Sequence, residues 1–356
     1  MILYAGSYTE MISGNFGGHG DGIYCFDFDP VSGSLQLLHR QLATNPSYLC
    51  IPSTKYLYTH TEVLKVNKPR VQAFKINEYD FSLDLISEQE IHGGWPCHIN
   101  FSKRNNCILV ACYETGNTVI FPVAQDGKLL PQAKVIQHEG SSVNKVRQER
   151  AHPHAVVFDE NFNNILITDL GIDKVMVYQI DANKGKFRKK LKQVVTLPPG
   201  SGPRHIAVHA ETKFAYVLNE LTATVTMMRY GDGDIELLKT YQTLPKEFKK
   251  VPSAAAIRIS DNGKFIYTSE RGDDSIAVLR FDSDEETIEI IGRQKTMGKT
   301  PRDINLDPTG NWLLAANQDS DSVAIFKVDK NTGMIKLENL VENIKSPVCL
   351  EWFPVK

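Results

Sequence analysis

Short apolar runs that end in a pair of polar residues recur along the whole chain, at intervals of about fifty residues. Each run starts with an aliphatic or aromatic residue and passes through apolar and small residues before the polar pair. The seven runs span residues 3–8, 56–62, 108–114, 165–170, 214–220, 265–271 and 312–318. Self-similarity at this period is typical of a β-propeller, in which one repeat forms one blade.

Further patterns flank each of these runs. Before each run an anchor residue opens a short apolar stretch, and proline fits there because the first residue of a strand has no ladder donor to lose. The anchors are Pro46, Pro96, Pro153, Pro203, Ala254, Pro301 and Pro347. After each run, apolar and polar residues alternate with a period of two, and a more polar strand follows a turn such as residues 125–127. The sequence therefore predicts an all-β, seven-bladed β-propeller with four antiparallel strands in each blade.

The two ends of the chain each supply part of one blade. The chain starts directly in a second strand and finishes after a lone first strand at residues 347–353. We therefore expect the C-terminal strand to lie innermost in a blade whose other three strands come from residues 2–42. That pairing closes the ring and hides two sheet edges. Because the repeat runs through the chain without a linker, we expect one domain over residues 1–356.

Composition narrows the class of protein. A net charge of −2 argues against a nucleic-acid partner. The chain shows no signal-like leader and no apolar stretch of about eighteen residues, so no membrane association is expected. The six cysteines have no paired spacing and replace apolar residues within strands, which favours reduced thiols in a cytoplasmic protein. No cysteine or histidine pair has zinc spacing, and we expect no metal, no cofactor and a monomeric state.

One charged segment stands apart from this picture. The basic run at residues 184–192 is interpreted as a solvated hairpin between outer strands rather than as a phosphate-binding site.

Two sets of residues are expected at one mouth of the central channel, because the first strand of a blade starts at the face where the second strand ends. Their ionisable and polar members are Arg204, Arg271, Arg302, His98, His152, His154, His205, Asn219, Glu62, Glu114 and Glu220. Arginine presents a planar fork of donors to carboxylate or phosphate oxygens, and histidine beside a carboxylate exchanges protons near neutral pH. The ring indicates a small anionic substrate and acid–base chemistry. The alternative is that each arginine pairs with a neighbouring acid and only fills the channel.

Two atypical loops open on the same mouth. Residues 137–151 lengthen one repeat, and the glycine-rich residues 11–21 lack the Lys-Ser/Thr ending of a P-loop. Each loop is either a lid that excludes water or a simple insertion.

Several phrases at this mouth resemble the lactonase family of seven-bladed propellers. They are Gly202-Pro203-Arg204-His205, Asn219-Glu220-Leu221, residues 269–278, residues 299–303, residues 317–321, and Arg147-Gln148-Glu149 followed by His152-Pro153-His154. The family includes propeller-type 6-phosphogluconolactonases and fungal carboxymuconate-lactonising enzymes. The resemblance covers essentially the whole chain, and it implies lactone chemistry on a phosphorylated or carboxylated substrate without a required metal.

The resemblance also implies roles for particular residues. In the fungal relatives a histidine, two arginines and a glutamate are important at this mouth, and they match His154 (or His152), Arg204, Arg271 and Glu220. His-Pro-His replaces the more usual Pro-His-x-His, so both histidines remain candidates.

Three functions stay open at this point. The first is hydrolysis of a sugar lactone, above all 6-phospho-glucono-lactone in the pentose phosphate pathway; the others are ring closure on a carboxylated muconate and non-catalytic binding. For hydrolysis, Glu220 or His154 is expected to take a proton from water, and Arg204 or Arg271 to stabilise the oxyanion. Arg302, His205 or Lys145 is expected to hold the phosphate. The further substrate-binding candidates are His152, His98 and Asn219.

Overall fold

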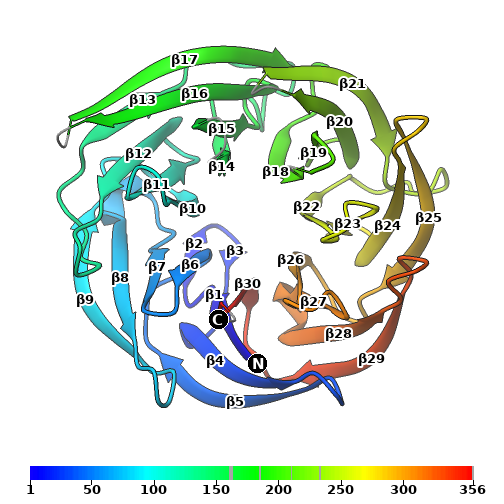
Figure 1. The fold of residues 1–356 in the computed structure, drawn as a ribbon, viewed down its shortest axis with the longest axis horizontal. Coiled ribbons are helices and arrows are strands. Elements are labelled where there is room, and N and C mark those ends of the chain that lie inside the picture. The colour runs from blue at the N-terminus through cyan, green and yellow to red at the C-terminus, as the bar shows by residue number, and fades with distance from the viewer. Residues whose placement is uncertain (160–162, 184–185, 210, 232–233, 355–356) are drawn as a thin grey trace.

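Seven four-stranded antiparallel sheets form a ring around a central channel (Figure 1). The computed structural model describes residues 1–159, 163–183, 186–209, 211–231 and 234–354. The innermost strands are β6 (Leu49–Ser53), β10 (Pro96–Ser102), β14 (Pro153–Asp159), β18 (Pro203–His209), β22 (Ala254–Ile259), β26 (Pro301–Leu306) and β30 (Pro347–Trp352). The predicted seven-bladed propeller is confirmed, and six of the seven predicted anchors are the first residues of these strands.

The remaining strands follow the predicted order outward. The second strands are β1 (Ile2–Ser7), β7 (Tyr56–His60), β11 (Cys107–Cys112), β15 (Asn164–Asp169), β19 (Phe214–Asn219), β23 (Phe265–Glu270) and β27 (Trp312–Asn317). The third strands are β4 (Ile23–Asp29), β8 (Arg70–Ile76), β12 (Asn117–Pro122), β16 (Lys174–Asn183), β20 (Thr224–Gly231), β24 (Ser275–Asp282) and β28 (Ser322–Val328). The outermost strands are β5 (Ser34–Gln41), β9 (Leu83–Glu90), β13 (Lys134–Gln137), β17 (Lys186–Thr196), β21 (Asp234–Gln242), β25 (Thr287–Lys295) and β29 (Ile335–Glu342).

The short elements outside the blades are few. A two-stranded hairpin, β2 (Met11–Ser13) and β3 (Phe16–Gly17), lies inside the ring of blades (Figure 1). Two 3₁₀ turns, η1 (Lys65–Asn67) and η2 (Gln318–Ser320), account for the helical residues that are described. In the described part of the chain, no helix is long and apolar enough to cross a membrane. β16 and β17 pair as antiparallel neighbours, and residues 184–185 of the predicted basic hairpin lie outside the described residues.

Side chains of neighbouring blades pack against each other to form the core. One cluster joins Tyr216 and Met227 of one blade to Ile266, Leu279 and Phe281 of the next. The second strands carry the longest buried runs; every residue of β11, β19 and β27 is buried, for example. This is why their sequences read as continuous apolar runs, whereas strands with one solvated face alternate. All six cysteines are buried within this core, as the sequence predicts.

The ring closes by pairing the two ends of the chain. β30 is antiparallel to β1, with Leu3 opposite Trp352 and Ala5 opposite Leu350. The resulting sheet has the order β30-β1-β4-β5, and both termini lie at this blade (Figure 1). The predicted closure is therefore confirmed, and it covers the inner edge of β1 with β30.

A register shift near the start of the innermost strands positions the site. In β10, β14, β18 and β26, pairing with the second strand shifts between the proline and the residue two positions later. The residue between them is left out of the ladder, and a bulge of this kind re-aims a side chain. The re-aimed residues are Cys97, His154, Arg204 and Arg302. The same local irregularity thus presents one thiol, one imidazole and two guanidiniums at one end of the channel.

Candidate active site

At the mouth, the side chains re-aimed by the bulges of the innermost strands lie beside side chains of residues that directly follow the second strands. Tyr113, Glu220 and Arg271 each stand one residue beyond β11, β19 and β23. Glu220 contacts both Arg204 and Arg271, and the rings of Tyr113 and His154 are 5.8 Å apart. The structure thus brings together four of the predicted catalytic residues, namely Glu220, His154, Arg204 and Arg271.

Asn219 and Glu270, the first residues of two of the polar pairs, point away from this mouth. Asn219, predicted to bind substrate, donates hydrogen bonds from Nδ2 to Thr224 Oγ1 and Thr226 Oγ1, both at 2.9 Å, and is completely buried. Glu270 accepts a hydrogen bond from Thr243, which directly follows β21 of the preceding blade. Successive side chains of a strand point to opposite sides, so in these two blades the second residue of the pair, Glu220 or Arg271, reaches the mouth. The structure does not place the Asn219 side chain at the site.

Glu220 holds three guanidinium groups. Its Oε1 lies 2.6 Å from Arg147 Nη2, and its Oε2 lies 3.1 Å from Arg204 Nε and 2.9 Å from Arg271 Nη2. The Glu220 side chain is only 4% exposed. The contact with Arg204 Nε is an ion pair without hydrogen-bond alignment, since that nitrogen has no hydrogen-bond partner in the described structure. One carboxylate therefore organises three positive charges, and the cluster keeps an excess of positive charge.

These charges decide the protonation of the cluster. Burial by itself raises the pKa of Glu220, but Arg271, Arg147 and Arg204 outweigh it and hold that pKa well below its usual range. Burial and the charges of Arg271 and Arg302 lower the pKa of Arg204 to about 10. Near neutral pH Glu220 is thus an anion and the arginines are cations. Because both Glu220 oxygens are engaged by guanidiniums, this carboxylate is poorly placed to accept a further proton.

His154 is a neutral imidazole at the site. Burial and the charge of Arg204 hold the pKa of its imidazole well below the usual range. The thiol of Cys97 lies 3.6 Å from the Pro153 and His154 carbonyl oxygens, which accept its single hydrogen, and 3.8 Å from His154 Nδ1. Its sulfur can then accept from Nδ1–H, and on that basis we assign the tautomer with the lone pair on Nε2. No described residue hydrogen-bonds to that Nε2, so it is available to a ligand.

His152 occupies a different position. Its Nδ1 donates to the Tyr113 carbonyl oxygen at 2.7 Å, and its Nε2 lies 3.2 Å from Glu149 Oε2. The imidazole also stacks on the Tyr113 ring, with centroids 4.1 Å apart. Both nitrogens are therefore engaged, which makes His154 the better candidate of the two histidines.

His205 and His98 lie deeper in the channel. Both line a cavity of about 180 Å³ together with Tyr48, Arg258 and Glu351. Arg204 Nη1 donates to His205 Nε2 at 2.9 Å, so this hydrogen bond helps to fix the position of the Arg204 side chain. Burial, reinforced by nearby positive charge, holds the pKa of His205 well below its usual range, and that of His98 likewise. His205 thus lies directly against the re-aimed Arg204 and has its ring centroid 5.8 Å from that of His154, whereas His98 lies behind His205 with centroids 5.6 Å apart.

Both atypical loops contribute side chains to the mouth. Arg147, in the loop between β13 and β14, reaches Glu220, and its Nη2 also lies 3.4 Å from the Tyr113 hydroxyl. Phe16, on the hairpin, packs against Tyr8 and Trp95 with centroids 5.3 and 5.5 Å apart. The sequence signal for Arg147 was present only in the phrase Arg147-Gln148-Glu149, which does not by itself assign a site role. Lys145, a predicted phosphate ligand in the same loop, is exposed.

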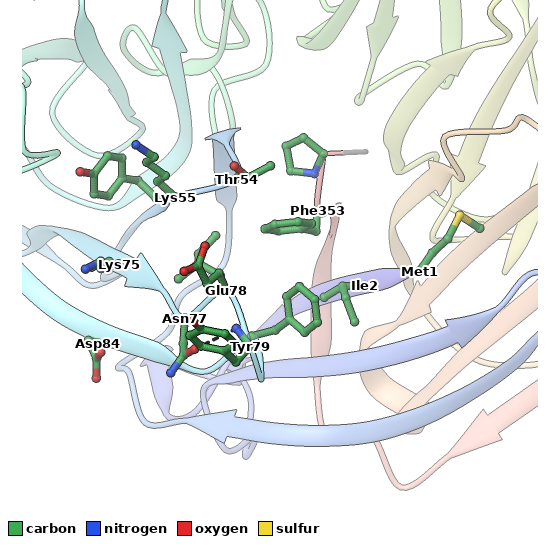
Figure 2. Close-up of a pocket in the computed structure, with 14 residues that line it drawn as sticks. Met1, Ile2, Thr54, Lys55, Lys75, Asn77, Glu78, Tyr79, Asp84 and Phe353 are labelled. Carbon is green, nitrogen blue, oxygen red and sulfur yellow. Dashed lines mark hydrogen bonds between the residues drawn. The ribbon is translucent and has the colours of Figure 1, made fainter. Parts of the chain in front are cut away.

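A large pocket lies elsewhere. A pocket of about 1000 Å³ is lined by turn residues between β6 and β7 and between β8 and β9, and by Phe353. Those turns are at the blade ends opposite the mouth. Figure 2 shows Ile2, Tyr79 and Phe353 around it. It contains no arginine and no histidine, in contrast to the mouth around Glu220.

Metal-binding geometry is not found in the part of the chain that the structure describes. No group of three or more histidine, cysteine, aspartate or glutamate side chains is arranged there to hold a metal ion.

Comparisons with known proteins agree with this architecture. The family model described as "Lactonase, 7-bladed beta-propeller" matches residues 2–352. The 6-phosphogluconolactonase of Bacillus subtilis is 31% identical, over 99% of this chain and 98% of that protein. The 6-phosphogluconolactonase of Formosa agariphila is 33% identical, over 96% of each. The solved periplasmic gluconolactonase of Pseudomonas aeruginosa superposes with a TM-score of 0.90 at 28% identity, covering 98% of both chains.

Proposed function

Because the chain belongs to the lactonase family of seven-bladed β-propellers, we propose that it hydrolyses 6-phospho-glucono-lactone to 6-phosphogluconate. Relatives over 30% identical along their whole length carry the name of that activity. The reaction is a step of the pentose phosphate pathway, and the six buried cysteines support a cytoplasmic location. A monomeric, single-domain enzyme is proposed.

The observation that carries the proposal is the Glu220 cluster beside a neutral histidine. Three guanidiniums around one carboxylate leave excess positive charge where a lactone carbonyl develops negative charge. His154 offers an unprotonated nitrogen next to them. Lactone hydrolysis needs these two elements, an activated water and a stabilised oxyanion.

The water is activated by His154 in this proposal. Its Nε2 accepts a proton from water as the water oxygen bonds to the lactone carbonyl carbon. A low pKa keeps His154 unprotonated at neutral pH. Entry of an anionic substrate beside the imidazole raises that pKa and so strengthens the base when substrate is bound.

The second half of the reaction returns this proton. Arg204 and Arg271 stabilise the tetrahedral oxyanion, because fixed charges cost no reorganisation during the reaction. When the carbonyl re-forms, the bond from the carbonyl carbon to the ring oxygen breaks, and protonated His154 donates its Nε2 proton to that oxygen. The product is the open-chain hydroxy acid. Glu220 keeps the two guanidiniums aligned, a positioning role rather than that of the base.

A second candidate substrate is the same sugar lactone without phosphate. It is favoured by the name of the Pseudomonas aeruginosa structure, a periplasmic gluconolactonase. The two candidates share the ring-opening chemistry and differ in whether the site must bind a second anionic group.

The test is hydrolysis of freshly generated 6-phospho-glucono-δ-lactone, measured against the spontaneous rate, beside glucono-δ-lactone and with and without chelator. Fast, chelator-resistant turnover that prefers the phosphorylated lactone supports the proposal. Turnover of glucono-δ-lactone alone supports the second candidate substrate, the sugar lactone without phosphate. No turnover of either rejects lactonase activity, and a carboxymuconate substrate is then the next assay.

A further inference from the structure

Arg302 is a buried cation without an acidic partner. It is 8% exposed, and it forms no hydrogen bond and no ion pair within 4.0 Å with any residue that the structure describes. An ionised group removed from water without a partner is costly. A strand bulge places this arginine at the mouth. Its missing partner there indicates a ligand whose negative charge pairs with the guanidinium.

Another arginine of this channel shows the contrast. Arg258 Nη2 lies 3.0 Å from Asp303 Oδ1, and its Nε donates to Asn305 Oδ1 at 3.2 Å. The arginines that meet Glu220 are likewise paired. These other arginines therefore each have an acidic partner in the fold, whereas Arg302 has none among the described residues.

Two aromatic rings lie against one side of the Arg302 guanidinium. Its Cζ lies 5.0 Å from the ring centroids of both Tyr8 and Phe16. Those two centroids are only 5.3 Å apart, so both rings are on the same side of the cation. Cation–π contacts of this kind stabilise the charge without accepting a hydrogen bond in the usual sense, and the N–H donors directed away from the rings stay available to an oxyanion.

Glu62, a carboxylate whose charge helps to raise the pKa of Arg302, is already engaged. Glu62 Oε1 accepts hydrogen bonds from the Tyr8 hydroxyl at 2.9 Å and from Trp95 Nε1 at 2.7 Å, and its Oε2 accepts from Ser47. Glu62 thereby fixes the aromatic wall, and it acts on Arg302 only through its field. The carboxylate does not occupy the guanidinium donors.

The hairpin holds Phe16 in this position. Gln318 Nε2 donates to the Gly17 carbonyl oxygen at 3.3 Å, and Gly20 N–H donates to the Tyr8 carbonyl oxygen at 2.6 Å. Tyr8 and Phe16 therefore come from a segment tied to both neighbouring blades. These hydrogen bonds therefore fix the two aromatic rings that contact Arg302.

We propose that Arg302, which lies against Tyr8 and Phe16, binds the phosphate of the substrate and so determines the preference for a phosphorylated lactone. This assignment rests on the proposed function and extends it. The Glu220 cluster then acts on the lactone carbonyl, while Arg302 holds the remote end of the same molecule. A bidentate guanidinium–phosphate pair supplies both affinity and orientation.

The kinetic test replaces Arg302 by methionine, which keeps an unbranched stem against the two rings. For wild type and Arg302→Met, kcat and KM are measured with 6-phospho-glucono-δ-lactone and with glucono-δ-lactone. The ratio of the two kcat/KM values is expected to fall on the order of 30-fold, mainly through KM of the phosphorylated lactone. Arg150→Met, an exposed arginine on a mouth loop, is the matched control and should leave the ratio unchanged. An equal loss on both lactones overturns the assignment.

An equilibrium test separates this assignment from the proposed activity. Calorimetric titration of 6-phosphogluconate, gluconate and inorganic phosphate requires no turnover. Wild type should bind 6-phosphogluconate more tightly than gluconate, and Arg302→Met should lose that advantage. If this holds but wild type hydrolyses no lactone, the proposed function fails and the phosphate site stands. If wild type hydrolyses the phosphorylated lactone and the variant keeps the advantage, the function stands and the assignment fails.

A second variant covers the case that Arg302→Met does not fold. Arg302→Lys keeps a charge but loses the planar fork. Weaker binding of 6-phosphogluconate, with gluconate binding reduced less, supports the assignment. Equal weakening of both ligands overturns it.

Discussion

Arg147 and Glu220, 73 residues apart in the chain, are joined by an ion pair of 2.6 Å between Nη2 and Oε1. The pair ties the long loop between β13 and β14 to the end of β19. The Glu220 side chain is 4% exposed and that of Arg147 is 40% exposed. The loop therefore reaches into the mouth through one charged side chain.

Replacing Arg147 by methionine should lower kcat/KM for the lactone by about tenfold, since one of three charged partners of Glu220 is removed. The same change should make the loop more sensitive to limited proteolysis, because its tie to β19 is lost. Arg150→Met is the control, as Arg150 is 62% exposed and pairs only with Glu149 among the residues described. Identical behaviour of the two variants would contradict a specific role for Arg147.

Replacing Glu220 by glutamine should lower turnover by about 100-fold while the β-propeller stays folded. An amide cannot neutralise the guanidiniums, and a small displacement of oxyanion donors has an effect of this size. The variant should also unfold at lower temperature, because removing one partner of a buried ion pair leaves uncompensated charge. Circular dichroism and lactone hydrolysis measure the two effects. Near-parental turnover would remove Glu220 from the mechanism.

Glu220 should also contribute a stability that depends on pH. Its pKa in the folded protein lies well below its usual range, whereas an unfolded glutamate titrates near ~4.3. A lowered folded pKa stabilises the protein above the unfolded pKa, and the contribution is lost as pH falls toward the folded value. The difference in unfolding free energy between wild type and Glu220→Gln should therefore shrink below about pH 4. Urea unfolding at neutral and acid pH measures it, and a constant difference would argue against an ionised Glu220.

Replacing His154 by glutamine should lower kcat by at least about 100-fold, the usual contribution of a general base. Because its pKa is well below the usual range, kcat/KM of wild type should stay level through about pH 6.5 and fall only in more acid solution. His152→Gln tests the neighbouring candidate, whose nitrogens both have partners, and should keep that pH profile. A wild-type profile that falls near pH 6.5 and disappears in His152→Gln would make His152 the base.

Removing residues 347–356 should abolish cooperative folding. The deletion removes β30, whose Val348, Cys349, Leu350 and Trp352 are buried, and it exposes the inner edge of β1. Thermal melting followed by circular dichroism tests this. A shortened protein with unchanged melting would show that closure through β30 is not required.

The fold was predictable because its signals are local. A period-two alternation, a proline at a strand start and a glycine turn each act within a few residues. Their repetition was enough to place the blades, and the odd strand at residues 347–353 was enough to predict the pairing with β1. The register shift beside each proline was not visible, because it depends on how the neighbouring strand pairs.

The candidate site was predictable only in its residue types. Topology brought Arg204, Arg271, His154 and Glu220 to one mouth, yet it also suggested Asn219, whose side chain points into its blade. Sequence could not separate His152 from His154, since the difference lies in the acceptors that occupy the nitrogens of His152.

The amino-acid sequence by itself thus determined the seven blades, their closure and the charge of the mouth, since these follow from short-range pattern and composition. Only the tertiary structure decided which charges meet. Three arginines from distant parts of the chain converge on Glu220, whereas Arg302 meets Tyr8 and Phe16 and no carboxylate. The physical reason is that ion pairing depends on distances of a few ångströms between residues far apart in the chain, and those distances are set by the packing of whole blades.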